Sequence, residues 1–147
     1  MKALSRITAA IAPSIPDSGV DLYVGIGGSP EAVLAAAAIR CLGGDIQAMI
    51  WPRNDEERYQ LLGAGYKDKL NQVYRAVDLA KGNNIIFCAT GVSDTPLLRG
   101  VRVHGHTAVT HSILMRARSK TVRMIEAYHD FAHKTIHLRS TKSETPI

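Results

Sequence analysis

The sequence predicts an α/β fold, an α/β/α sandwich with a mixed sheet. Up to Thr90, apolar β-favouring runs alternate with helical patterns, and after Gly100 a strongly alternating segment begins. Alternating strands and helices are typical of largely parallel strands, and the later segment predicts an antiparallel hairpin added to them. We expect one α/β domain over residues 1–139. The polar tail over residues 140–147, which contains Pro146, is expected to be disordered.

The stretch Asp21–Glu31, DLYVGIGGSPE, combines a strand, a glycine turn and a helix start. Its apolar run Leu22–Ile26 has the composition of a buried strand. Ser29 is expected to cap the following helix, which runs to Cys41, with Pro30 at its first position. Glycines let the backbone approach a ligand closely, and the N–H groups of a helix start favour an anion. The turn therefore predicts an anion site.

Glu31 adds one carboxylate to this turn. A carboxylate beside a phosphate is repelled unless a cation lies between them, so Glu31 suggests a divalent metal, Mg²⁺ or Mn²⁺. The alternative is that Glu31 only complements the helix dipole and that the turn is structural. The turn is not the full dinucleotide-binding fingerprint, because Ala32 and Val33 stand where that motif needs a later glycine.

The remaining elements follow from local patterns. Helical patterns span Ser5–Ile15, Asp55–Leu62 and Ala76–Lys81. The first has Ile7, Ala10 and Ile11 on one face and is ended by prolines, and the second begins at the N-cap Asn54. Strand patterns span Asp45–Trp51, the uncharged and buried Asn84–Ala89, and the two hairpin arms Thr107–Met115 and Thr121–Ala127.

Histidines and loop acids offer other candidate sites. Three histidines are closely spaced, and three more recur at intervals of four, which on a helix would share a face: His104, His106, His111 and His129, His133, His137. No fixed cysteine or acid partner completes a zinc motif, so hydrogen-bonded or solvated histidines are expected. Asp94, in the loop after the third strand, is a further candidate to face the site.

Basic residues gather at the predicted hairpin tip: Arg116, Arg118, Lys120 and Arg123. A solvated hairpin tip is the expected interpretation, and a phosphate site is the alternative. No aromatic residues interleave with them, so we expect no nucleic-acid partner, although the net charge of +5 and pI near 9.4 suit any anion.

Composition bounds the class of protein. The chain has 147 residues, of which 46% are apolar and 21% charged, as in a soluble globular domain. No apolar run approaches the roughly 18 residues that a membrane span needs, so no membrane partner is expected. Cys41 and Cys88 lie in apolar settings and are expected to be buried free thiols of a cytoplasmic protein, with a disulfide as the alternative.

Longer segments carry a family resemblance: VDLYVGIGGSPEAVLAAAAIRCLGGDIQ, RNDEER, IIFCATGVSDTPLLRGVR and TAVTHSILMRARSKTVRMIEAYH. Over roughly residues 5–130 the chain resembles the C-terminal half of class II fructose-1,6-bisphosphatase. Some relatives in that family also act on sedoheptulose-1,7-bisphosphate.

The resemblance implies a fold and a site. It implies the C-terminal domain of the lithium-sensitive, metal-dependent sugar phosphatase superfamily, whose members are stacked α/β sandwiches. It implies hydrolysis of the 1-phosphate of fructose 1,6-bisphosphate, in gluconeogenesis or carbon fixation, with Mn²⁺ or Mg²⁺ as cofactor. By the family pattern Glu31 is a metal ligand and Gly28 touches the sugar phosphate. Gly27, Gly28 and Ser29 are the expected substrate-binding residues.

Departures from the family pattern limit the expected activity. The family's other metal-binding acids, its substrate-binding Tyr and its Lys and Arg residues belong to an N-terminal half with no counterpart in this chain. Its Asp-Gly-Asp motif is replaced by Leu4-Ser5-Arg6. We expect about half an enzyme, inactive alone and with no catalytic residue of its own, that pairs with the missing half or forms a homo-oligomer. The alternative is a non-catalytic binding or oligomerisation module.

Overall fold

The computed structural model describes residues 2–133, with side chains from residue 7 onward. The helices are α1 (Lys2–Ile11), α2 (Ser29–Leu42), α3 (Asp55–Gly63) and α4 (Ala76–Leu79), with short 3₁₀ turns at Ala12–Ser14 and Lys67–Lys69. The strands are β1 (Gln47–Ala48), β2 (Tyr74–Arg75), β3 (Ile86–Thr90), β4 (Arg102–His104), β5 (Thr107–Arg116) and β6 (Thr121–Asp130). The predicted tail at residues 140–147 and His137 lie outside the described residues.

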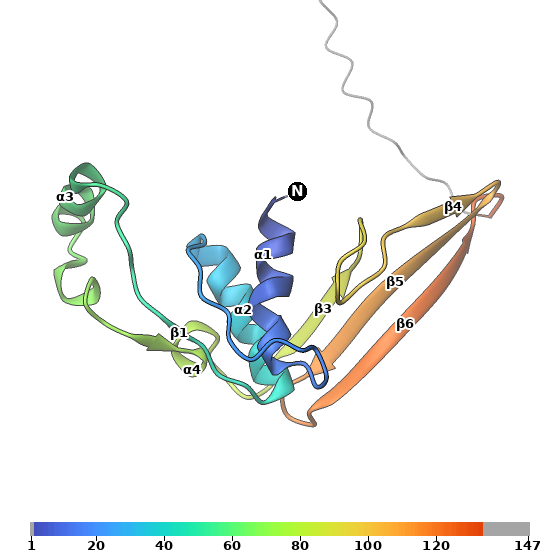
Figure 1. Cartoon of the computed structure of the whole chain (residues 1–147), viewed down its shortest axis with the longest axis horizontal. Helices are drawn as coiled ribbons and strands as arrows, with labels where there is room; N and C mark the ends of the chain where they lie inside the picture. The colour runs from blue at the N-terminus through green and yellow to red at the C-terminus, as the bar shows by residue number, and fades with distance from the viewer. Residues whose placement is uncertain (1, 134–147) are drawn as a thin grey trace, which may run out of the picture.

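A four-stranded sheet is organised around β5. One edge of β5 pairs with β6 along its whole length, from Thr107 opposite Asp130 to Arg116 opposite Thr121. The other edge of β5 pairs with β3 near the hairpin tip and with β4 at the far end. The short strands β1 and β2 form a separate two-stranded sheet (Figure 1).

The predicted mixed sheet is wrong for residues 2–133, because each strand pairing there is antiparallel. The predicted strand Leu22–Ile26 is irregular and exposed, and Asp45–Trp51 contributes only a two-residue strand. The physical reason is that the predicted parallel strands have no parallel partner strand within residues 2–133. After β3 the chain forms β4 and then turns back as β5 beside β3. A strand that turns back in this way pairs antiparallel, without a parallel crossover.

Helices α1 and α2 lie on one face of the sheet (Figure 1). The opposite face leaves Ile86 65% exposed and also exposes Cys88. The described part therefore has two layers, helices on a sheet, where the sequence predicts three. It remains an α/β structure, and no helix within residues 2–133 combines the length and apolar character needed to cross a bilayer.

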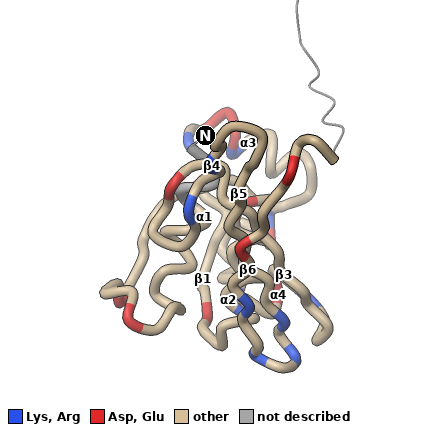
Figure 2. Tube along the Cα trace, turned by 90° about the vertical axis from the view of Figure 1, so that its right-hand side faces the viewer, with Lys and Arg blue, Asp and Glu red and all other residues tan. Residues whose placement is uncertain are grey.

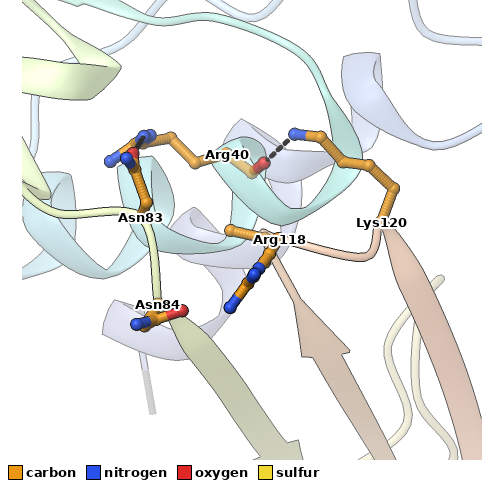
Figure 3. A pocket seen from close by; sticks show the side chains of 6 residues that line it. Arg40, Asn83, Asn84, Arg118 and Lys120 are labelled. Atoms are coloured by element: carbon orange, nitrogen blue, oxygen red, sulfur yellow. Dashed lines mark hydrogen bonds between the residues drawn. The ribbon is translucent and has the colours of Figure 1, made fainter.

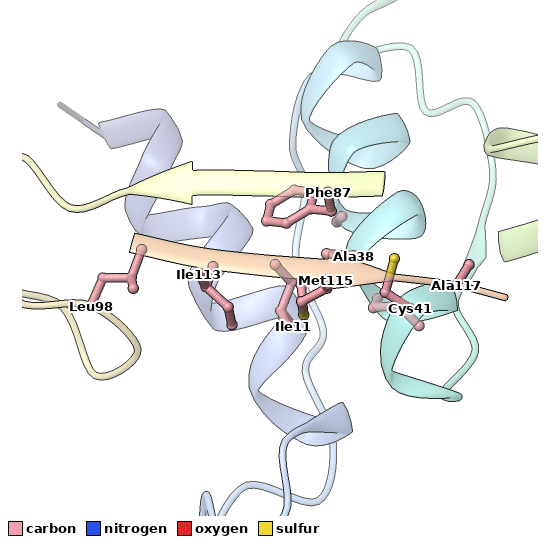
Figure 4. Packing of buried hydrophobic residues seen from close by; sticks show 10 residues of the cluster. Ile11, Ala38, Cys41, Phe87, Leu98, Ile113, Met115 and Ala117 are labelled. Carbon is pink, nitrogen blue, oxygen red and sulfur yellow. The ribbon is translucent and has the colours of Figure 1, made fainter. Parts of the chain in front are cut away.

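The main core fills the space between these two layers (Figure 4). Its largest fully buried side chains are Ile11, Ile39 and Met115, and Phe87 and Ile113 pack with them. The helical face predicted for the first helix is confirmed, since Ile11 is 1% exposed and Ile7 and Ala10 pack against the same cluster. Small side chains in α2 allow close approach of the layers; Ala35 and Ala38 are at most 2% exposed.

The predicted helix ends hold with small shifts. The first helix ends at Ile11 rather than Ile15, and the chain continues as the 3₁₀ turn that contains Pro13. The Asn54 side chain accepts a hydrogen bond from the Glu57 amide at 2.8 Å, which confirms the predicted cap of α3. Gly43 ends α2 with φ of +92° and donates to the Ile39 carbonyl at 2.9 Å, a left-handed C-terminal cap.

The predicted hairpin is confirmed, since β5 and β6 pair antiparallel along their whole length. Ile113 and Met115 are buried against the helices, and the tip bends at Lys120 with φ of +50°. The prediction for the preceding strand is half right, since Phe87 is buried but Ile86 and Cys88 are exposed. The thiol of Cys41 is buried as predicted, whereas the prediction of a buried Cys88 is wrong. A one-sided sheet buries alternate residues only.

Candidate functional site

The glycine turn leads into the N-terminus of α2. Gly28, not Ser29, is the N-cap, and its carbonyl accepts the first helical hydrogen bond from Ala32 at 3.1 Å. No side chain of the described residues caps this end, so the predicted Ser29 cap is wrong by one residue. Pro30 has no N–H, and the amides of Ser29 and Glu31 precede the first intrahelical bond. These amides remain available to an anion.

The Glu31 side chain folds back over the turn. A Cβ placed on Gly28 would collide with Glu31 Oε2, so a side chain at position 28 would displace the carboxylate. Glu31 is half-buried rather than extended into solvent. Gly27 has open space around it, with nothing within 4 Å of a Cβ placed there. The structure thus brings the Glu31 carboxylate and the glycine backbone together at one helix end.

The approach to this turn is apolar and uncovered. Leu22 is 77% exposed, Val24 84% and Ile26 66%. The Tyr23 ring lies against Gly25, where a Cβ would come within 2.6 Å of the phenol oxygen. Exposed large apolar side chains in a row are unusual for a monomer surface.

Metal-ligating residues are few around the turn. Within residues 2–133, no three His, Cys, Asp or Glu side chains come together in a way that could hold a metal ion. Glu31 is a suitable hard oxygen donor for Mg²⁺ or Mn²⁺, but one carboxylate does not make a metal centre. The described residues therefore do not form a metal centre of three or more such ligands, and Glu31 is the ligand that the turn itself offers.

The histidines have structural contacts. The Arg99 amide donates to His111 Nδ1 at 3.1 Å, and His129 Nε2 lies 2.9 Å from the Thr110 hydroxyl. His129 and His133 do not share a helical face, because His129 lies in β6 and His133 follows that strand. Strand geometry takes precedence over a spacing of four when the segment pairs along β5.

Asp94 is also structural. Its carboxylate accepts a hydrogen bond from the Gly100 amide at 2.9 Å and closes the loop between β3 and β4. Within the same loop, Thr95 Oγ1 accepts from the Leu98 amide at 2.9 Å. Gly91 and Gly100 are required here, since a Cβ on either would collide with loop backbone at Arg99 or Ser93. The loop and the glycine turn lie toward the same end of the layers, where β3 ends and α2 begins (Figure 1).

Arg99, Glu126 and Tyr128 contact one another near β4, at the end of the sheet that we call its open end. Arg99 forms an ion pair with Glu126 at 2.6 Å, and the Tyr128 hydroxyl donates to Glu126 Oε1 at 2.9 Å. These contacts hold the pKa of Glu126 below its ordinary value, with the Tyr128 hydrogen bond as the largest cause, and they raise the pKa of Tyr128. A cavity of about 160 Å³ beside them also reaches His104.

A second cavity, about 510 Å³, lies at the other end of α2. Of the basic residues predicted to gather at the hairpin tip, Arg118 and Lys120 line it, together with Arg40, Asn83 and Asn84 (Figure 3). Sequence reasoning missed the last three, because they stand at least 34 positions from either tip residue (118 − 84). No local pattern links them.

Comparison with known proteins places the chain among sugar phosphatases. Residues 5–129 match the family described as bacterial fructose-1,6-bisphosphatase, glpX-encoded. The chain is 40% identical over 134 residues to the fructose-1,6-bisphosphatase class 2 of Haemophilus influenzae. It is 36% identical over the same length to the fructose-1,6-bisphosphatase 1 class 2 of Escherichia coli strain K12. Each match covers 84% of this chain, and the chain spans about 40% of the length of these curated relatives.

Proposed function

Because the chain belongs to the family of bacterial, glpX-encoded fructose-1,6-bisphosphatases, we propose that it supplies the C-terminal part of such a phosphatase. The substrate is fructose 1,6-bisphosphate, and the reaction is hydrolysis of its 1-phosphate. The proposal is carried by one observation, the Glu31 carboxylate folded over Gly28 at the start of α2. The alternative in which the turn is only structural does not require the acid and the bare backbone to meet.

Each residue of the turn has a role in this proposal. The backbone of Gly27, Gly28 and Ser29 approaches a phosphate of the substrate, and the positive end of the α2 dipole favours that charge. Glu31 is one ligand of Mn²⁺ or Mg²⁺, whose other ligands come from outside the described residues. Such an ion, when bound, supplies polarisation of the phosphoryl group and an activated water.

The isolated chain is expected to be nearly inactive. With Mn²⁺ and fructose 1,6-bisphosphate it should release little phosphate, because one carboxylate cannot hold the metal. Adding the N-terminal part of a curated relative in trans should restore turnover, as measured by phosphate release. Robust turnover by the isolated chain would contradict the assignment of a partial site.

Two acids in the first turns of helices separate the ligand role of Glu31 from a helix-dipole role. Glu31→Ala should abolish the activity restored in trans, whereas Glu56→Ala in α3 should leave it unchanged. Both residues stand in first turns, where each complements a helix dipole, and Glu56 is exposed on a separate helix. Equal losses in the two variants would mean that Glu31 acts only through its helix.

Two neighbouring glycines test the geometry. Gly28→Ala introduces a Cβ where Glu31 Oε2 lies, so Mn²⁺ binding by the reconstituted protein should weaken. Gly27→Ala adds the same methyl group into open space and should preserve Mn²⁺ binding. Water-proton relaxation by Mn²⁺ reports this difference without reliance on turnover. An unchanged Gly28→Ala variant would argue against Glu31 as a ligand.

A second candidate function is a binding or oligomerisation module, favoured by the exposed apolar row Leu22, Val24 and Ile26. In this case the apolar side chains of the row become buried by association with an N-terminal part of the family or with a second copy of the chain. Val24→Asp should weaken that association in light-scattering chromatography. Val92→Asp, 72% exposed in another loop, is the matched control. A chain that stays monomeric and binds no N-terminal part would exclude this function.

A further inference from the structure

We propose that the cavity at the C-terminal end of α2 binds a phosphate-bearing small molecule, as an anion site separate from the glycine turn. The cavity measures about 510 Å³. Arg40, in the last turn of α2, stands nine residues after Glu31 (40 − 31), which is about 14 Å along the helix at 1.5 Å per residue. The inference does not depend on the proposed function.

The lining of the cavity is one-sided in charge. Its polar residues are Arg40, Arg118, Lys120, Asn83 and Asn84, and no acidic side chain lines it among the described residues. Guanidinium, ammonium and amide groups all donate hydrogen bonds. Figure 2 shows Lys and Arg gathered at this end of the molecule, around the hairpin tip and the end of α2. The chemistry of the lining therefore matches an anion.

Two of the cations also hold the fold together. Arg40 donates to the Ala80 and Gly82 carbonyls and lies 3.5 Å from Asn83 Oδ1. Lys120 donates to the Arg40 carbonyl, at the negative end of the α2 dipole. These contacts explain why Arg40 and Lys120 stand at a helix end. They also fix both head groups in place, and an ammonium with three donors retains two of them for a ligand.

Arg118 has no such structural role. Within the described residues its side chain makes no recorded hydrogen bond or ion pair, and it is exposed. In Figure 3 it extends into the cavity region without a dashed contact, whereas Arg40 and Lys120 are tied to their neighbours. A third cation beside two others is repelled unless an anion joins them. An Arg fork is suited to phosphate oxygens.

Two of the three cations, Arg40 and Lys120, are held in place before any ligand binds. Thr121 Oγ1 lies 2.8 Å from Ser119 Oγ and holds the hairpin tip, and the buried Ala117 anchors it to the core. Cations held in place by the fold lose little freedom when a ligand arrives, which favours binding. The volume exceeds that of one phosphate group, so a phosphomonoester with an organic body fits.

The test uses the full 147-residue chain, labelled with ¹⁵N, in low-salt buffer with EDTA. Titrations with inorganic phosphate and with glucose 6-phosphate are followed through backbone amide shifts. We expect shifts at Asn83, Asn84, Arg118 and Lys120, and tighter binding of the sugar phosphate. Arg118→Ala should weaken binding about tenfold, as expected for one lost charged hydrogen bond.

Arg58→Ala is the matched control, since Arg58 is an exposed arginine on α3. It removes the same charge and should leave the affinity unchanged. Equal weakening by Arg58→Ala and Arg118→Ala, or shifts confined to Ser29 and Glu31, would overturn the proposal. A preference for inorganic phosphate over glucose 6-phosphate would assign the site to the free ion instead of a phosphomonoester. Circular dichroism checks that both variants keep the fold.

Discussion

Two apolar stretches of this chain have similar composition and opposite surroundings. In β5, Ile113 is 2% exposed and Met115 is fully buried, because β3 and β6 flank the strand and α1 and α2 cover it. Before α2, Leu22 and Val24 are 77% and 84% exposed. The difference teaches that strand-forming residues become a strand only where a ladder partner and a covering layer exist.

The largest expected effect is on the free energy of unfolding, which substitutions in the two stretches should change by different amounts. Met115→Ala should lower the free energy of unfolding by about 2–5 kcal/mol, because it removes a fully buried side chain from the main core. Leu22→Ala should change it by less than about 0.5 kcal/mol in the isolated chain. Urea denaturation measures both. A large loss for Leu22→Ala would show that the stretch is packed in solution.

The two thiols give the same contrast between a covered and an uncovered surface, measured as a rate of chemical modification. Burial raises the pKa of the Cys41 thiol, so little reactive thiolate forms there, whereas Cys88 is exposed on the uncovered face of β3. Iodoacetamide should modify Cys88 first, and Cys41 only after unfolding, as read by peptide mass spectrometry. In denaturant the two rates should converge. Equal rates in the native protein would mean that Cys41 is not buried between α2 and the sheet.

A smaller effect is expected in α3, which has no buried residues. Asn54→Ala removes the N-cap contact to Glu57 and should cost about 1 kcal/mol. Because α3 packs little against the core, the loss should appear as local fraying. Hydrogen exchange should therefore quicken in α3 while β5 stays protected. A global change would indicate that α3 is coupled to the sheet.

The smallest expected effect is a pH dependence at the open end of the sheet. The folded pKa of Glu126 lies below its ordinary 4.5, and that of Tyr128 above its ordinary 10.0. The stabilisation of the folded state by these two groups is thus fully present at pH values between 4.5 and 10.0. It is lost as pH falls through the folded pKa of Glu126, and as pH rises through that of Tyr128.

Glu126→Gln should remove the acid limb of this dependence. Midpoints of thermal unfolding measured over roughly pH 3 to 7, a range that spans the ordinary pKa of a carboxylate, should then vary less than in the parent chain. Exposed pairs contribute little, so the shift should be small. An unchanged pH profile would mean that the Arg99 and Tyr128 contacts do not persist in solution.

Local signals determined much of the structure. The Asn54 cap, the glycine end of α2 and the alternation of Ile113 and Met115 all act within a few residues, through helix hydrogen bonds or strand periodicity. The meeting of Glu31 with a glycine turn is equally local, since the residues adjoin. The sequence by itself therefore determined the helices, the hairpin and the candidate anion turn.

Tertiary structure alone decided which strands pair and which faces are covered. The fate of Leu22–Ile26 depends on a partner strand that residues 2–133 do not supply, and the exposure of Cys88 depends on a layer absent from one face. The cavity of Arg40, Asn83 and Arg118 joins positions far apart in the chain. Pairing and burial are non-local, so no pattern within a segment encodes them.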